Sequence, residues 1–198
     1  NFQPKGLAER FAGMPEQVIK GFVADRQKLF SGGTASRLDT EVALGQWPAL
    51  LSRLETQLER DGDFLLGSQP SIADFSHYHA LWFVASNRAV ADALEPYPAV
   101  RAWMQRVRDI GHGSHAELSA DEAIRIAREA TPAALPTDAI SSPTGLAAGQ
   151  AVIVNAVDYG TDEVAGTLLY EGAEEIIIAR EDERAGLVHV HFPRFGFR

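Results

Sequence analysis

The feature that most constrains the fold is a change of hydrophobic period partway along the chain. Before residue 131 the apolar residues recur every three or four positions, which is typical of helices. After residue 149 they alternate with polar residues in short β-branched runs, which is typical of half-buried strands. Residues 131–149 hold three prolines and little charge, a composition typical of linkers. We therefore expect an α+β protein with a helical domain at 1–130, a linker at 131–149 and a β module at 150–198.

Within the helical part we expect four to five helices. The spacing predicts helices over 15–30, 38–60, 72–93 and 99–110. Pro48 is expected to kink or restart the second of these. The third is apolar on most sides, which predicts a central position. Ser119 and Glu122 form an S-x-x-E capping box that predicts a further short helix.

The runs after the linker are separated by turns rich in Gly, Asp and Glu. Four or five short antiparallel strands with such turns predict a small antiparallel barrel, loosely similar to Src-homology-3 domains.

Composition excludes several classes of partner and chemistry. The net charge of -9 opposes binding to nucleic acid and to anionic membranes. The chain has no cysteine, so it has no disulfide, no thiolate nucleophile and no Cys-ligated metal. No apolar run approaches the roughly 20 residues that span a bilayer, and no signal-peptide pattern is present. We expect a cytoplasmic protein whose partner is small and apolar, or another protein.

Ser71 and Asp74 stand three positions apart before an apolar run, a pattern compatible with a catalytic pair or with a helix start. We interpret them as a structural capping box with Asp in the place usually held by Glu. Pro70 and Phe75 would form the accompanying hydrophobic staple. Loss of either polar partner should cost about 0.5–2 kcal/mol.

These residues belong to a longer ordered pattern. An L-E-x-x-L sequence at 54–58 is followed by an F-L-x-G turn at 64–67, the sequence P-S-I-A-D at 70–74, and Y-P-x-x-x-x-W from Tyr97 to Trp103. In this order the motifs resemble the helical C-terminal domain of glutathione S-transferases, and the resemblance covers about the first 115 residues.

The resemblance implies a thiol-conjugating enzyme. In that family an N-terminal thioredoxin-like domain binds glutathione and activates its thiol, but no βαβ pattern precedes Pro15. We therefore expect this chain to be the helical half of a longer parent and to be inactive alone, with no catalytic residue assigned. Glutathione would be the co-substrate of the parent, and no covalently bound cofactor is expected. Family habit implies a homodimer.

In the family, the start of the first helix of this domain lines the pocket for a small hydrophobic electrophile. By position, the resemblance implies Phe11, Met14, Gln17, Val18 and Phe22 as substrate-binding residues. Core packing is an equal or better alternative for Val18 and Phe22.

Two other groups of residues invite a functional interpretation. Alternation places His189 and His191 on one strand face, but two ligands make a weak metal site, and we predict none. Phe192, Arg194 and Phe195 could form a partner surface, although core closure of the module is the stronger alternative. A non-catalytic interaction scaffold is thus the second hypothesis for the whole chain, and a metal hydrolase using the two histidines ranks last.

Overall fold

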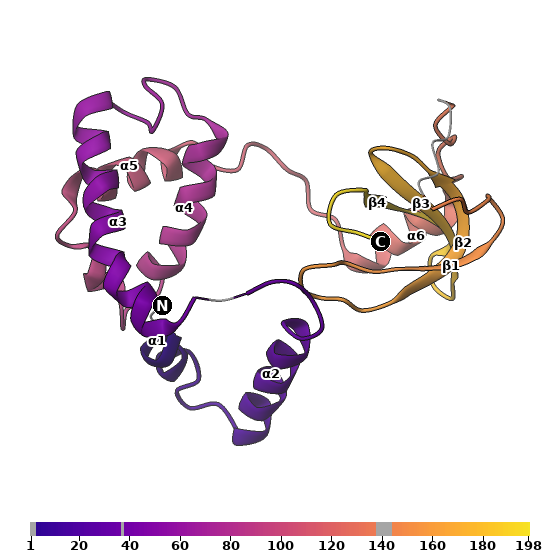
Figure 1. Cartoon of the computed structure of the whole chain (residues 1–198), viewed down its shortest axis with the longest axis horizontal. Helices are drawn as coiled ribbons and strands as arrows, with labels where there is room; N and C mark the ends of the chain where they lie inside the picture. Colours follow the sequence, from indigo (N-terminus) through magenta and orange to yellow (C-terminus); the bar gives the residue numbers. More distant parts are fainter. Residues whose placement is uncertain (1–2, 37, 138–143) are drawn as a thin grey trace. The chain divides into compact units, whose positions relative to one another are not determined.

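The computed structural model describes residues 3–36, 38–137 and 144–198 and is an α+β protein, as predicted (Figure 1). The described residues form six α-helices, one short 3-10 helix and four strands. The helices are α1 (Gln3–Arg10), α2 (Glu16–Leu29), α3 (Thr40–Asp61), α4 (Ile72–Ala85), η1 (Ala91–Leu94), α5 (Pro98–Asp109) and α6 (Ala120–Glu129). The strands are β1 (Ala151–Val154), β2 (Val164–Glu171), β3 (Glu175–Asp182) and β4 (Gly186–Pro193). Within the described ranges, no helix is long and apolar enough to cross a membrane.

The chain divides into two compact units, each made of two separate segments. The helical unit comprises residues 1–19 and 37–115, and the sheet unit comprises residues 20–36 and 116–198. This division differs from the sequence-based boundary at residue 131, because α6 and most of α2 group with the sheet.

The core of the helical unit lies among α3, α4 and α5. Its largest member, Trp103, is fully buried, as is Val100 one turn earlier on α5. The buried members from all three helices are Leu51, Leu58, Leu81, Val100, Trp103, Met104 and Val107. Each large side chain buried in this way contributes about 1.5–3 kcal/mol to folding.

Three details of the helical part differ from the predictions. Helix α4 ends at Ala85, eight positions before the predicted end, and the chain then turns into η1. Helix α3 continues through Pro48 as a single element and does not restart. Helix α1 was not predicted, because its eight residues are too few to show a clear apolar period.

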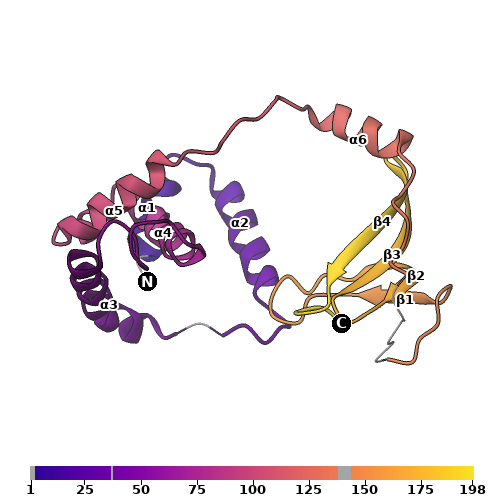
Figure 2. The ribbon, with the colours of Figure 1, turned by 90° about the horizontal axis from the view of Figure 1, so that it is seen from above.

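The sheet has the order β1-β2-β3-β4, and each neighbouring pair is antiparallel. Its four strands agree with the predicted number of four or five, and Figure 2 shows the labelled strands β1 to β4 side by side. Alternation sends one set of side chains into a common core, formed by Val154, Leu168, Ile176, Ile178 and Phe192. The turn between β3 and β4 is closed by the Asp182 carboxylate, which accepts hydrogen bonds from the amides of Arg184 (2.9 Å) and Ala185 (2.8 Å).

The predicted barrel is wrong, because the sheet is not closed. Beyond the sheet, the Asn155 amide donates to the Arg198 carbonyl (2.9 Å) and the Arg198 amide donates back (3.1 Å), so the two ends of the sheet approach each other. This pairing is only an isolated bridge, since β1 has four residues and pairs with β2 alone. The β module is therefore an open four-stranded sheet.

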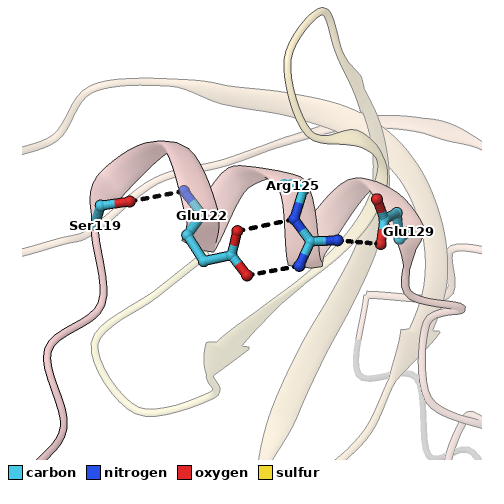
Figure 3. A network of polar contacts seen from close by, with 4 residues as sticks. All are labelled: Ser119, Glu122, Arg125 and Glu129. Atoms are coloured by element: carbon cyan, nitrogen blue, oxygen red, sulfur yellow. Dashed lines mark hydrogen bonds and ion pairs between the residues drawn. The ribbon is translucent and has the colours of Figure 1, made fainter.

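Helix α6 begins as predicted, because the Ser119 hydroxyl accepts a hydrogen bond from the Glu122 amide at 3.1 Å. On its exposed side, Arg125 donates to Glu122 one turn before it and to Glu129 one turn after it (Figure 3). These carboxylates raise the pKa of the Arg125 guanidinium, and the pKa of Glu122 is correspondingly lowered. Such pairs at three and four positions stabilise the helix itself, so we interpret the network as structural. Helix α6 lies against β4.

Candidate functional site

The five predicted substrate residues lie in and around the first turns of α2. Phe11 and Met14 stand in the connection between α1 and α2, while Gln17, Val18 and Phe22 lie on α2 itself. Val18 and Phe22 are about 40° apart around the helix axis, so both side chains are on one side of α2. Gln17 lies about 100° from Val18, toward another side.

None of the residues of α2 is buried, and the same holds for the shorter α6. Val18 is 55% exposed and Phe22 is 37% exposed. The guanidinium carbon of Arg26 lies 5.8 Å from the centre of the Phe22 ring, within the range of a cation–π contact. Val18 and Phe22 therefore keep part of their apolar surface exposed in this structure.

The pair Ser71 and Asp74 is structural, as predicted, and Asp74 does more than cap the helix. Its carboxylate is fully buried. One oxygen, Oδ2, accepts hydrogen bonds from the amide (2.8 Å) and the hydroxyl (2.7 Å) of Ser71. The other, Oδ1, accepts from the Leu65 amide (2.9 Å) and from Nε1 of Trp103 (2.8 Å). Asp74 therefore joins the F-L-x-G turn, the start of α4 and the middle of α5.

Burial and hydrogen bonding act on the pKa of Asp74 in opposite directions. Burial raises the pKa, because it penalises the charged carboxylate. The hydrogen bonds from Leu65, Trp103 and Ser71 stabilise the charge and outweigh burial, so the pKa lies below its ordinary value. A buried carboxylate that stays ionised and has four donors around it is suited to holding structure and not to transferring protons.

A second carboxylate with a structural role, Glu55 of α3, was not predicted. Its two oxygens accept hydrogen bonds from the amides of Ala99 and Val100, both at 2.8 Å. These amides belong to the first turn of α5, which has no capping side chain of its own. The sequence signal is Tyr97 at the N-cap of α5, because tyrosine is not a capping residue and the first amides of the helix then need an acceptor from elsewhere.

Helix α4 has two apolar sides, and only one of them is covered. Asp74 and Leu81 face the core. Four large side chains are exposed on another side, namely Ile72, Phe75, Trp82 and Phe83. Within the described residues, the prediction of a central helix is therefore correct for only one side of α4. A helix that is apolar all round is normally buried, so this exposed strip is a candidate contact surface.

The histidines of β4 do not converge on a metal. His191 Nδ1 pairs with Oε2 of Glu175 at 2.9 Å, and His189 Nδ1 is buried with no hydrogen-bond partner in the part of the chain that the structure describes. Among the described residues, no group of three or more His, Asp or Glu side chains could hold a metal ion.

The three residues of the predicted partner surface have different environments. Phe192 is buried and packs against Phe197 with ring centres 5.4 Å apart. Nη1 of Arg194 lies 3.1 Å from the buried carboxylate of Glu171. Phe195 is 95% exposed. Of the three, Phe195 alone offers apolar surface to a partner.

A shallow hollow of about 730 Å³ lies on the β module. Its lining consists mainly of small and β-branched side chains, with Arg180 and Glu181 as the charged members. We assign no chemistry to this hollow.

Comparison with known proteins agrees with the motif resemblance. Residues 19–106 match the family model described as "Glutathione S-transferase, C-terminal domain". The chain is also similar to a solved structure, that of a GST-like protein from Pseudomonas syringae, with 52% sequence identity and a TM-score of 0.70. That similarity covers 80% of this chain and 56% of the other, so this chain spans little more than half of that protein's length. A comparison with curated proteins finds no match.

Proposed function

We propose that this chain supplies the electrophile-binding side of a glutathione S-transferase-like enzyme, and that glutathione is bound and activated by a part of the parent protein outside this chain. The observation that supports the proposal is the match of residues 19–106 to the C-terminal domain family, together with the exposed apolar side of α2 at Val18 and Phe22. Conjugation by such an enzyme needs a thiol of lowered pKa and an electrophile held next to it. Val18 and Phe22, which lie one turn apart on α2, would supply exposed apolar surface for the electrophile.

The test uses the full-length parent protein, including whatever is encoded upstream of Asn1. Conjugation of glutathione to a chromogenic aryl halide is followed in the parent and in a Phe22→Ala variant. We expect the KM for the aryl halide to rise by about threefold to thirtyfold, as expected for lost apolar contact, and the KM for glutathione to stay the same.

Val23→Ala is the matched control, because Val23 is exposed on α2 about 100° from Phe22. No conjugation by the parent would refute the proposed activity. Equal effects of Phe22→Ala and Val23→Ala would refute the assignment of the wall to the Val18 side of α2.

A non-catalytic scaffold is the second candidate, and the exposure of Phe195 is the observation that favours it. In that case Phe195→Ala should abolish capture of a protein partner and leave the melting temperature unchanged. The scaffold would be favoured over the enzyme by two results together. The parent would form stable complexes only through residues 150–198, and it would show no conjugating activity. A homodimer is proposed for either candidate and is tested by sedimentation of the parent protein.

A further inference from the structure

We propose that the β module holds the C-terminal end of α2 and thereby fixes the helix that carries the candidate electrophile residues. The contact joins the C-terminal end of α2 to the β module, and both of these segments belong to the sheet unit. The consequence for the substrate rests on the proposed function, whereas the contact itself does not.

The contact begins with backbone hydrogen bonds between segments far apart in sequence. The amides of Thr34 and Ala35 donate to the carbonyls of Val157 and Asp158, both at 2.9 Å. In the other direction, the Gly160 amide donates to the carbonyl of Leu29 at 2.7 Å. Leu29 is the last residue of α2, and its carbonyl has no partner within the helix. The loop of the β module thus caps the helix.

Two glycines make this close approach possible. A Cβ atom on Gly33 would lie 1.9 Å from the carbonyl oxygen of Asp158, which is far too close for any side chain. Gly160 has a φ of +60°, a conformation that side chains other than glycine rarely adopt. The backbone contact between the two segments therefore depends on glycine on each side.

Side chains extend the same contact. The rings of Phe30 and Tyr159 stack with centres 5.5 Å apart. Nζ of Lys28 lies 2.5 Å from Oδ1 of Asp162, and the Thr34 hydroxyl donates to the Val157 carbonyl at 3.2 Å. The ring stack and the backbone bonds give this contact its specificity, since an exposed ion pair alone stabilises little.

The contact matters because α2 gains little from burial. No residue of this 14-residue helix is buried, and isolated helices of this length are marginal in water. A helix anchored at Leu29 keeps its C-terminal turns, from about Phe22 onward, in one position relative to the β module. The β module would thus preorganise the electrophile side of the enzyme without touching the electrophile.

Hydrogen–deuterium exchange resolved by peptide tests the contact on the chain itself. In Gly33→Ala we expect exchange of the amides at 20–36 to rise by about tenfold or more, because two to three backbone hydrogen bonds are lost. Exchange in β3 and β4 should stay slow. Gly21→Ala is the matched control, since a Cβ there meets open space, and it should leave exchange at 29–36 unchanged.

Tyr159→Ala is the second variant, and it removes the ring stack without adding steric strain. It should raise exchange at 29–36 by about twofold to tenfold. A folded sheet with unchanged exchange at 29–36 in Tyr159→Ala would overturn the proposal, even if Gly33→Ala failed to fold. Faster exchange at 20–36 in this variant supports it.

Kinetic measurements on the parent enzyme then distinguish the anchoring of α2 from its proposed role in electrophile binding. In Tyr159→Ala we expect the KM for the electrophile to rise by about twofold to tenfold, with the KM for glutathione unchanged. Faster exchange without any effect on the KM for the electrophile would support the proposal that the β module anchors α2, and it would refute a role of that anchoring in electrophile binding. Both effects together support the whole inference.

Discussion

Replacing Asp74 should destabilise the helical unit more than its place in a capping box suggests. Two donors to its Oδ1 atom, the Leu65 amide and Nε1 of Trp103, lie in a region where water cannot replace the carboxylate, because Leu65 is 3% exposed and Trp103 is fully buried. In Asp74→Ala both donors would be left without a partner, and the start of α4 would lose its cap.

The magnitude follows from these contacts. Each buried donor that loses its acceptor lowers the free energy of unfolding by about 1–3 kcal/mol, and loss of the helix cap lowers it by about 0.5–2 kcal/mol. Since contributions within one network do not add fully, we expect the free energy of unfolding to fall by about 3–5 kcal/mol in Asp74→Ala. In Asp74→Asn the remaining oxygen can keep both Oδ1 contacts, so the loss should be only about 1–3 kcal/mol.

The assay is urea unfolding followed by tryptophan fluorescence. All three tryptophans lie in the helical unit, so this signal reports that unit and not the β module. Asp92→Asn is the control, because Asp92 is exposed, and its effect should stay within about 0.5 kcal/mol. A loss in Asp74→Ala no larger than that of the control would refute the reasoning.

The dependence on pH gives a second test of the same carboxylate. Because the pKa of Asp74 is lower in the folded state than its ordinary value of 3.8, the unfolded chain takes up the proton first as the pH falls. The contribution of the charge is therefore complete above the ordinary pKa and is lost as the pH falls through the folded pKa. The difference in stability between the natural chain and Asp74→Asn should be constant near neutral pH and narrow below about pH 4.

Three further predictions concern other parts of the chain. Glu55→Ala should lower the unfolding free energy by about 1–3 kcal/mol in the same urea assay, because the amides of Ala99 and Val100 lose their acceptor; a loss equal to that of Glu55→Gln would argue against the capping role. Ile178→Ala should cost about 2–5 kcal/mol in thermal unfolding followed by circular dichroism at the sheet band, because Ile178 is fully buried, and a neutral result would contradict the core assignment. Phe195→Ala should leave that thermal transition unchanged, since its side chain has almost no contacts to lose.

The local pattern of the sequence predicted most of the helices and strands, but it predicted few of their boundaries correctly. The four strands were predictable from short β-branched runs between turn residues, although β3 has three consecutive buried isoleucines and does not alternate. Helix α5 was predictable from Val100, Trp103 and Val107 on one side. The end of α4 was predicted too late, because the alanines and the valine at 89–93 extend the apolar period of the sequence, whereas the helix ends before the polar residues 86–88. Closure of the sheet was also not predictable, since it depends on whether residues 155–157 and 196–198 form a full ladder.

The candidate site was predictable only by position. Exposed Val18 and Phe22 have the same spacing that a buried helix face would have, so periodicity could not distinguish a ligand wall from a core. The contact of Gly33 with the Asp158 carbonyl leaves no periodic signal at all, because its partners are joined only by the folded chain. Long-range backbone pairing of this kind becomes visible only in the folded structure.

The arrangement of the sheet unit has a consequence for synthesis on the ribosome. Thr34 and its acceptor Val157 are separated by 123 positions, and the whole helical unit from residue 37 onward is made between them. At about 5–20 residues per second, translation needs roughly 6–25 s to produce the partner of α2. During that interval α2 lacks its anchor, so we expect its apolar side chains to be accessible to chaperones on the nascent chain.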